Sequence, residues 1–120
     1  MARIGLLHPG EMGAAVGHLL VVNGHDVCWA GDDRSAATHA RADAAGLRDV
    51  RDIASVAESV EIVISLCPPA AALEVARRVA GLGFNGVYVD ANAVSPQTAA
   101  VIASAVETGG ARFVDGDVIG

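Results

Sequence analysis

Short apolar runs and longer segments of helical periodicity alternate along the whole chain. The apolar runs cover residues 3–7, 26–30, 47–50, 61–66, 86–90 and 112–115. A short apolar run bounded by turn residues is typical of a buried strand, and helical segments between such strands form parallel βαβ units. The pattern therefore predicts a doubly wound parallel α/β sheet of six strands with the order 3-2-1-4-5-6, whose ligands bind outside the carboxyl ends of the strands.

The helical segments between these runs carry start and stop signals. The first is expected over residues 11–23, with a core-facing stripe formed by Val16, Leu19 and Leu20. Gly13 and Gly17 thin one face of the same helix. Further helices are predicted over residues 36–45 and 53–59, after the prolines at 68 and 69, and after Ser95-Pro96, which suits an N-cap and a first helical position.

Composition narrows the class of protein. The chain has 120 residues and 52% hydrophobic content, enough for one packed domain over residues 1–120. Its net charge of −6 argues against a nucleic-acid partner. No apolar run approaches the roughly 18 residues that suggest a membrane span, and no signal peptide is evident, so we expect a cytoplasmic protein without a membrane partner. All eight basic residues are arginines, so the chain has no lysine.

The first strand runs into a glycine turn, in the stretch Arg3-Ile4-Gly5-Leu6-Leu7-His8-Pro9-Gly10-Glu11-Met12-Gly13. This resembles the dinucleotide fingerprint G-x-G-x-x-G, with His8 in place of the first glycine. Proline disfavours helical geometry in the residue before it, so we expect His8 to finish the strand in extended geometry and Pro9-Gly10 to make the turn. Gly10 and Gly13 then face the phosphates and the strand, which indicates a Rossmann-type nucleotide site.

The loop after the second strand offers two chemistries at the position that reads the cofactor ribose. Asp32 or Asp33 would accept a hydrogen bond from the 2′-hydroxyl of NAD, whereas Arg34 with Ser35 would bind the 2′-phosphate of NADP. We favour NADP and keep NAD as the alternative. A third interpretation is a solvated turn in which Asp33 or Ser35 caps the next helix.

Two further loops are expected over the same crevice. The rigid loop 65–69 can line it with backbone, and Cys67 is expected to be structural because no histidine partner is specified. After the fifth strand, Asn92 offers a carboxamide that could bind cofactor or substrate, or could simply close a turn. Asp90 is expected to be structural. His8 is interpreted as a packed turn residue rather than a general acid, and no set of residues has metal-ligand spacing.

Four motifs stand in order along the chain: the glycine turn, Ile64-Ser65-Leu66-Cys67-Pro68, the stretch from Asp90 to Thr98, and Phe113-Val114-Asp115. Together they resemble the β-hydroxyacid dehydrogenase family, which includes 6-phosphogluconate and 3-hydroxyisobutyrate dehydrogenases and has imine reductases as relatives. The resemblance implies a Rossmann cofactor domain in which Gly10, Glu11 and Met12 contact the pyrophosphate. It also implies that Leu66, Cys67 and Pro68 line the cofactor.

The departures from the family pattern concern its catalytic parts. His8-Pro9 replaces the usual start of the glycine turn, Asn92-Ala93 replaces a serine-threonine pair, and Asp117 and Ile119 replace a proline and a serine. Typical members have a catalytic lysine and a helical carboxyl-terminal domain that closes the site and forms the dimer. The catalytic acid or base is therefore unassigned here, and a homodimer is expected only with such a domain present.

These observations predict the cofactor-binding part of an NAD(P)-dependent oxidoreductase, acting on a small hydroxyacid, imine or related substrate and inactive as this chain alone. An alternative is a stand-alone NAD(P)-binding module that senses redox state without catalysis. Methyl transfer from S-adenosylmethionine is a third hypothesis, which the Pro9-Gly10-Glu11-Met12-Gly13 turn fits less well.

Overall fold

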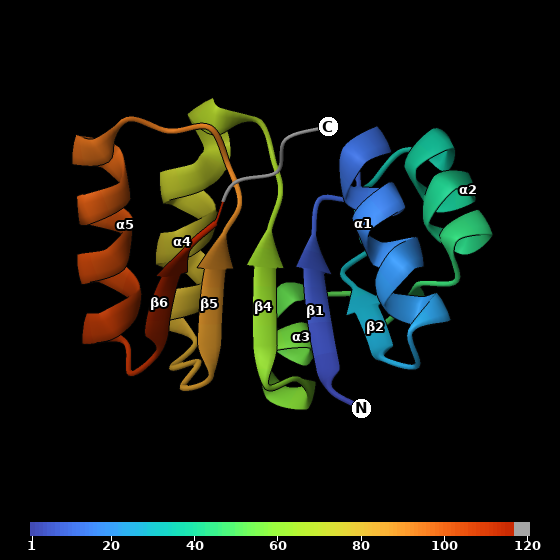
Figure 1. Cartoon of the computed structure of the whole chain (residues 1–120), viewed down its shortest axis with the longest axis horizontal. Coiled ribbons are helices and arrows are strands. Elements are labelled where there is room, and N and C mark those ends of the chain that lie inside the picture. The colour runs from blue at the N-terminus through green and yellow to red at the C-terminus, as the bar shows by residue number, and fades with distance from the viewer. Residues whose placement is uncertain (117–120) are drawn as a thin grey trace.

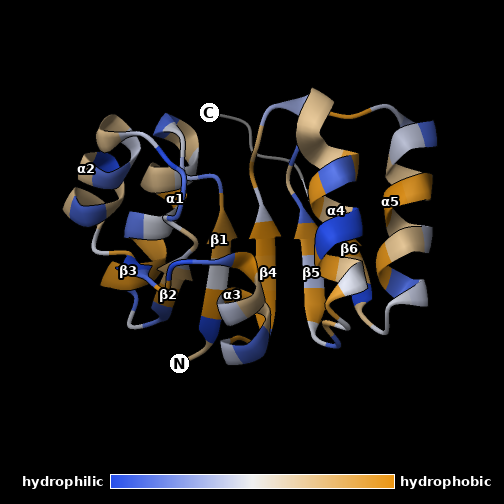
Figure 2. Ribbon diagram, turned by 180° about the vertical axis from the view of Figure 1, so that it is seen from behind, coloured by the Kyte–Doolittle hydropathy of each residue, from blue (hydrophilic) through white to orange (hydrophobic). Residues whose placement is uncertain are grey.

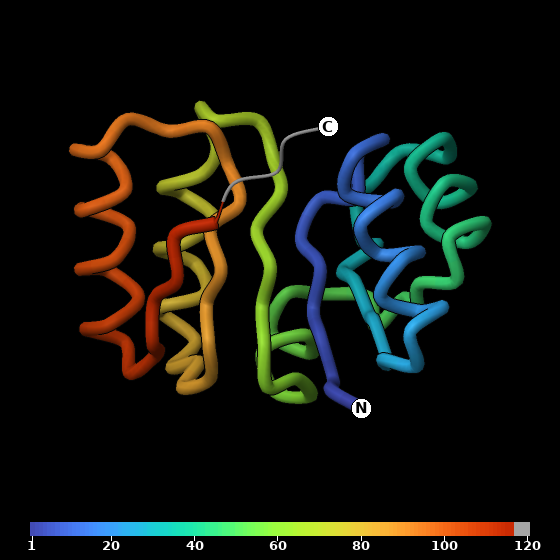
Figure 3. The backbone as a smooth tube through the Cα atoms, in the orientation of Figure 1, coloured from blue at the N-terminus to red at the C-terminus, as the bar shows by residue number. Residues whose placement is uncertain are grey.

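The computed structural model describes residues 1–116 and contains the six parallel strands that the apolar pattern predicts (Figure 1). The strands are β1 Arg3–Leu7, β2 Asp26–Trp29, β3 Arg48–Asp49, β4 Ile62–Ser65, β5 Val87–Asp90 and β6 Arg112–Asp115. Their order in the sheet is β3-β2-β1-β4-β5-β6, as expected. The strand order reverses between β1 and β4, where Leu7 is in register with Ser65. All six carboxyl ends therefore lie along one edge of the sheet, at the top of Figure 3.

Helices connect successive strands and cover the two faces of the sheet separately. They are α1 Glu11–Val22, α2 Ala36–Ala45, α3 Ile53–Ser59, α4 Ala72–Gly81 and α5 Pro96–Thr108, with a short 3-10 turn, η1 Pro69–Ala71, before α4. The helices α1 and α2 lie on one face, and α3, α4 and α5 lie on the other (Figures 1 and 2). The predicted caps hold, since the side chain of Ser95 accepts a hydrogen bond from the Thr98 backbone at 3.1 Å.

Side-chain alternation along the strands produces two hydrophobic cores. On β1, Ile4 and Leu6 pack with α1 and α2, while Leu7 packs with the core under α3, α4 and α5. On β2, Trp29 joins the first core and Cys28 joins the second. This two-sided burial explains why the strands are read from the sequence as continuous apolar runs rather than as alternating ones.

The face of α1 that packs on the sheet differs from the expected one. Its buried residues are Gly13, Ala14 and Gly17, whereas Leu19 is 60% exposed. Of the predicted stripe Val16, Leu19 and Leu20, the partly buried Leu20 packs against the first core, but the fully buried positions are the small ones, because the helix approaches the sheet too closely for large side chains. A Cβ atom on Gly17 would lie 2.7 Å from Leu47 Cδ2 and 3.0 Å from Leu6 Cδ2.

The half of the sheet formed by β4, β5 and β6 lacks a helix on the α1 side, within the part of the chain that the structure describes (Figure 1). Two rows of aliphatic residues cross these strands. In one row Ile62 is in register with Val87, and in the other Ile64 is in register with Val89 and Val89 with Val114. These side chains are only partly buried, and Val114 is 46% exposed. We call these five residues the open sheet face.

None of the described helices is both long and apolar enough to span a bilayer. The family departures at Asp117 and Ile119, and the end of the domain expected over residues 1–120, lie outside the described residues.

We expect Gly17→Ala to destabilise the domain. The added methyl would overpack against Leu47 and Leu6 in the core, and overpacking costs about 1–3 kcal/mol, of which the better helix propensity of alanine recovers about 1 kcal/mol. The free energy of unfolding, measured by urea denaturation, should therefore fall. Gly10→Ala serves as the control because a Cβ atom there meets nothing within 4 Å. A higher unfolding free energy for Gly17→Ala than for the unaltered chain would contradict the close packing of α1.

Candidate functional site

The glycine turn joins the end of β1 to the start of α1 in three residues. Strand β1 ends at Leu7, the Gly10 N–H donates to the His8 carbonyl at 2.7 Å, and α1 begins at Glu11. His8 has a φ of +59°, so it is left-handed and not extended. The prediction that His8 finishes the strand was wrong.

The physical reason is the sharpness of this turn. The chain must reverse between a central strand and the helix packed on it, and the residue at the first glycine position of the fingerprint makes the tight turn. Histidine is among the side chains that occupy the left-handed region more often than most, although at some cost. Pro9 still excludes right-handed helical geometry for His8, but the left-handed alternative is the one used.

The first turn of α1 presents an anion site. Its N-cap, Gly10, makes no side-chain cap, and the first intrahelical bond runs from the Ala14 N–H to the Gly10 carbonyl at 2.8 Å. The N–H groups of Glu11, Met12 and Gly13 precede that bond, and such groups point toward a ligand at the positive end of the helix dipole. The space above Gly10 is open, so a phosphate can approach the backbone.

Two cavities share Arg34 as a lining residue, and the first of them borders the glycine turn. The first, of about 220 Å³, has Arg34 and Thr38 on one side, and on the other the residues His8, Pro9, Gly10 and Pro68. The second, of about 310 Å³, lies where β2 and β3 end. Its charged residues are Asp32, Asp33, Arg34, Arg51, Asp52 and Arg78.

The structure thus brings together most of the residues expected from the loop after β2. Asp32 faces Arg51, with Oδ1 3.9 Å from Nε, and Asp33 has a left-handed φ of +62°. Ser35 caps α2, since its hydroxyl accepts a hydrogen bond from the Thr38 backbone at 3.1 Å. The capping interpretation is therefore correct for Ser35, while its contact with a cofactor stays a prediction.

Asn92 lies apart from the two cavities, in a buried bridge between the ends of β4 and β5. Its Oδ1 accepts from the Cys67 N–H at 2.7 Å, and its Nδ2 donates to Ser65 Oγ at 3.0 Å. The Asn92 N–H in turn donates to Asp90 Oδ1 at 2.8 Å. Asn92 is 5% exposed, so its carboxamide holds the rigid loop after β4 in place. Direct contact of Asn92 with a cofactor or substrate stays a prediction.

Burial disfavours the charged forms of two groups in this bridge, the Cys67 thiol and the Asp90 carboxyl group. Burial raises the pKa of the Cys67 thiol, which favours the unreactive protonated form. Burial also raises the pKa of Asp90, whose Oδ2 is buried without a partner in the described structure. Both observations support the structural roles expected for these residues. Leu66 lies beside Gly13 and packs against the core under α1.

Electrostatics at the glycine turn favour an anion. Burial, and then the positive charges of Arg34 and Arg78, lower the pKa of His8 to about 4. His8 is therefore neutral near pH 7, as its interpretation as a packed turn residue requires. The same two guanidinium groups that disfavour a proton on His8 would attract a phosphate.

Sequence reasoning missed several residues of these cavities, among them Arg51, Thr38 and Arg78. Arg51 follows β3 at the same sheet edge as Arg34, so strand order was a usable signal for it. Thr38 lies one helical turn after Ser35 and belongs to the predicted α2. Arg78 lies within α4, and no local motif marks it. Among residues 1–116, no cluster of metal-ligating side chains is present.

The sheet order, the glycine turn at its reversal point and the arginine-lined cavities define a Rossmann nucleotide-binding domain. Comparison with known proteins identifies it further. Residues 2–120 match the family described as the NAD binding domain of 6-phosphogluconate dehydrogenase. The chain therefore belongs to this family, which confirms the resemblance drawn from the four motifs. No curated protein matches the chain.

Solved structures show the same relationship. A conserved protein of unknown function, MTH1747, described as similar to 3-hydroxyacid dehydrogenases, is 32% identical over 98% of this chain and 44% of its own, with a TM-score of 0.90. The 3-hydroxyisobutyrate dehydrogenase of Mycobacterium tuberculosis is 26% identical over 100% of this chain and 41% of its own, with a TM-score of 0.86. An imine reductase from Bacillus cereus shares the fold, with 23% identity over 97% of this chain and 40% of its own and a TM-score of 0.81. The chain thus spans less than half the length of these proteins and corresponds to an NAD(P)-binding domain.

We expect Gly10→Ala to weaken binding of both NADPH and NADH without unfolding the domain. The methyl group would occupy the open space through which the pyrophosphate approaches the backbone, and we expect a loss of about tenfold in affinity, or 1.4 kcal/mol. Calorimetric titration measures both affinities, and urea denaturation checks that stability is kept. Unchanged affinity for both cofactors would place the pyrophosphate elsewhere.

His8 should make the domain lose stability in acid. Its pKa falls from 6.5 to about 4 on folding, so stability is complete above pH 6.5 and is lost as pH falls toward 4. The loss attributable to His8 is up to about 3 kcal/mol. His8→Asn tolerates the left-handed backbone and removes the titration, so urea denaturation at several pH values should show a smaller acid loss. The matched control His18→Asn, which replaces an exposed histidine on α1, should lose as much stability in acid as the unaltered chain. An equal acid loss in the His8→Asn and His18→Asn variants would contradict the assignment of this loss to His8.

Proposed function

We propose that this chain binds NADP in preference to NAD and holds the nicotinamide for hydride transfer in an oxidoreductase. The observation that carries the proposal is the position of Arg34 between the glycine turn and the cavity after β2. The pyrophosphate and the 2′-phosphate of one NADP molecule require positive groups at these two adjoining places.

The charges around the second cavity suit a 2′-phosphate. Asp52 is engaged at the start of α3, where its Oδ1 accepts from the Ser55 N–H at 2.7 Å. Asp32 faces Arg51. Within residues 1–116, Arg34 and Arg78 have no carboxylate partner. A phosphate would give these guanidinium groups the charge-assisted hydrogen bonds they lack.

Asp32 is compatible with the same ligand. A ribose that carries a 2′-phosphate keeps its 3′-hydroxyl, and a carboxylate accepts a hydrogen bond from such a hydroxyl. The mixture of acids and arginines in this cavity therefore fits a phosphorylated ribose better than it fits inorganic phosphate alone. With NAD, the same cavity would leave Arg34 and Arg78 without an anion.

The remaining parts of the site would orient the rest of the cofactor. The amides of Glu11, Met12 and Gly13 would bind the pyrophosphate, and the loop 66–68, braced by Asn92, would line the nicotinamide side. When bound, NADPH supplies the hydride, while this chain supplies position and electrostatics. A catalytic acid or base is not assigned to any residue of this chain.

The family relationship supports a proposal for the substrate class. We propose a small hydroxyacid, imine or related compound, because similar solved structures are described as a 3-hydroxyisobutyrate dehydrogenase and an imine reductase. A cytoplasmic location remains part of the proposal, as does a homodimer formed through a helical carboxyl-terminal domain. Family membership does not by itself exclude the redox-sensing alternative, and it supports the enzyme because the matched family is that of a dehydrogenase domain.

Arg34→Ala should weaken NADPH binding by roughly ten- to a hundredfold, the loss expected for charge-assisted hydrogen bonds. NADH has no 2′-phosphate, so its affinity should change less than threefold, about 0.6 kcal/mol. Arg78→Ala should act in the same direction with a smaller loss. Calorimetric titration of each variant with both cofactors measures the ratio.

The control is Arg77→Ala, which removes a neighbouring arginine of α4 that lines a different groove, between α4 and α5. It should leave both affinities unchanged. Equal losses of NADPH and NADH in Arg34→Ala would contradict the preference for NADP. Failure of the unaltered chain to bind either cofactor would contradict the proposed function as a whole.

A further inference from the structure

Gly31, the residue just before the loop that carries Asp32 and Arg34, has both of its backbone polar groups held by side chains of other elements. Its N–H donates to Asp49 Oδ1 at 2.9 Å, and its carbonyl accepts from His39 Nε2 at 2.8 Å. Asp49 lies on β3 and His39 on α2. We call these three residues the Gly31 clamp. A Cβ atom on Gly31 would overlap the Asp49 carboxylate, so the clamp requires glycine here.

The same Asp49 oxygen also holds the next loop along the sheet edge. The Arg51 N–H donates to Asp49 Oδ1 at 2.8 Å, and the Arg51 carbonyl accepts from the Asp32 N–H at 2.8 Å. One carboxylate therefore ties the loop after β2 to the loop after β3. Arg51 is left-handed, with a φ of +84°. A non-glycine residue keeps such a backbone only when its surroundings hold it there.

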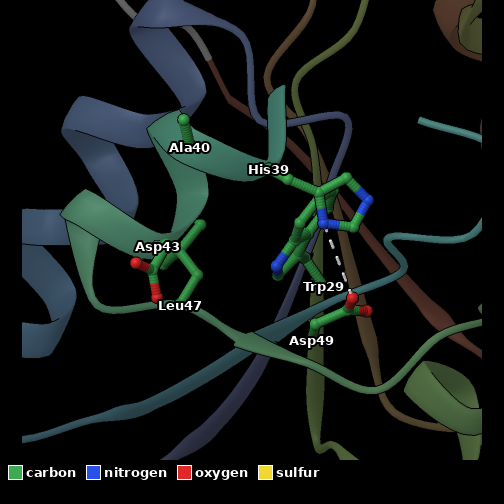
Figure 4. Close-up of a pocket in the computed structure, with 6 residues that line it drawn as sticks. All are labelled: Trp29, His39, Ala40, Asp43, Leu47 and Asp49. Atoms are coloured by element: carbon green, nitrogen blue, oxygen red, sulfur yellow. Dashed lines mark ion pairs between the residues drawn. The ribbon is translucent and has the colours of Figure 1, made fainter. Parts of the chain in front are cut away.

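His39 completes the clamp from above the sheet. Figure 4 shows its imidazole beside Trp29 and directed toward Asp49. The His39 and Trp29 ring centroids are 4.9 Å apart in an edge-to-face arrangement, and His39 Nδ1 lies 3.8 Å from Asp49 Oδ2. Because a carbonyl oxygen only accepts, the hydrogen bond to Gly31 places the proton on Nε2. The His39 and Asp49 side chains are 44% and 38% exposed, so the hydrogen bonds to Gly31 fix the geometry more than the contact between the two side chains does.

We propose that Asp49 and His39 are positioning residues for cofactor selection, which rests on the proposed binding of NADP. They touch neither cavity's ligand directly in this assignment. They hold the two loops so that Arg34 and the Asp32–Arg51 pair keep their places around the cavity proposed for the 2′-phosphate, and this preorganisation spares the ordering cost on binding. Loss of the clamp should therefore lower the affinity for NADPH more than the affinity for NADH.

A purely structural role makes a different prediction. If Asp49 and His39 only join β2, β3 and α2, their removal should destabilise the domain and weaken both cofactors by the same factor. The ratio of NADPH to NADH affinity separates the two roles. Trp29 is the single tryptophan of the chain, so its fluorescence reports directly on the removal of His39.

The experiment compares His39→Ala with His39→Gln and Asp49→Ala with Asp49→Asn, by calorimetric titration with NADPH and with NADH. Glutamine can still donate to the Gly31 carbonyl, and asparagine can still accept from the two N–H groups. The two alanine variants should lose about tenfold in the NADPH to NADH affinity ratio, and the conservative variants should recover most of it. Asp43→Ala is the matched control, because Asp43 lines the same pocket as His39 and Asp49 but makes no hydrogen bond to Gly31 (Figure 4).

An unchanged affinity ratio in folded His39→Ala and Asp49→Ala would overturn the proposal, as would an equal change in Asp43→Ala. If Asp49→Ala does not fold, the comparison of His39→Ala with His39→Gln decides the question, with Trp29 fluorescence confirming that the edge-to-face contact was altered. These outcomes are distinct from a failure of the proposed function. In that case the unaltered chain would fail to bind NADPH, or Arg34→Ala would leave the ratio unchanged.

Discussion

The close approach of α1 to the sheet is the constraint on which the rest of this structure depends. Gly17 allows it, because any side chain at that position would enter the space of Leu47 and Leu6. Gly13 and Ala14 continue the same small-residue face toward the start of the helix. A helix with a large apolar stripe would stand farther from β1, and its first turn would no longer lie directly above the point where the strand order reverses. The proposed phosphate site is thus a consequence of core packing as much as of the glycine turn itself.

Much of the fold could be predicted because the two sequence signals, short apolar runs and turn residues, are local. Apolar runs and turn residues located all six strands, and β6 and the helices α2 and α3 have the expected bounds. The strand β3 was predicted over residues 47–50 but pairs over only Arg48 and Asp49. It is an edge strand with one neighbour, so its length depends on pairing that no local pattern specifies. The face of α1 that packs on the sheet was mispredicted for a similar reason. Helical periodicity favours large apolar residues, whereas the residues of α1 buried against the sheet are small.

Part of the candidate site could likewise be predicted from the sequence, and part could not. The glycine turn and the loop after β2 follow from the motif and from spacing along the chain, and the structure places His8, Gly10 and Arg34 around one cavity. The conformation of His8 did not follow, because the rule for residues before proline describes an average preference and the turn demands a glycine-like backbone. The position of Arg78 beside Arg34 could not be predicted from the sequence either. Arg78 reaches the site from within α4 only after the sheet has brought residues 34 and 78 together.

The Gly31 clamp bears on how cofactor preference could be moved between proteins. The stretch Gly31-Asp32-Asp33-Arg34-Ser35 looks like a self-contained cassette, but its first residue is held by side chains 8 and 18 positions further along the chain. Grafted into another Rossmann domain without partners equivalent to His39 and Asp49, the same five residues would carry their arginine on a differently shaped loop. If the proposed preference for NADP holds, selectivity is a property of two strands and a helix, and transplanting it would require the edge of the sheet along with the loop.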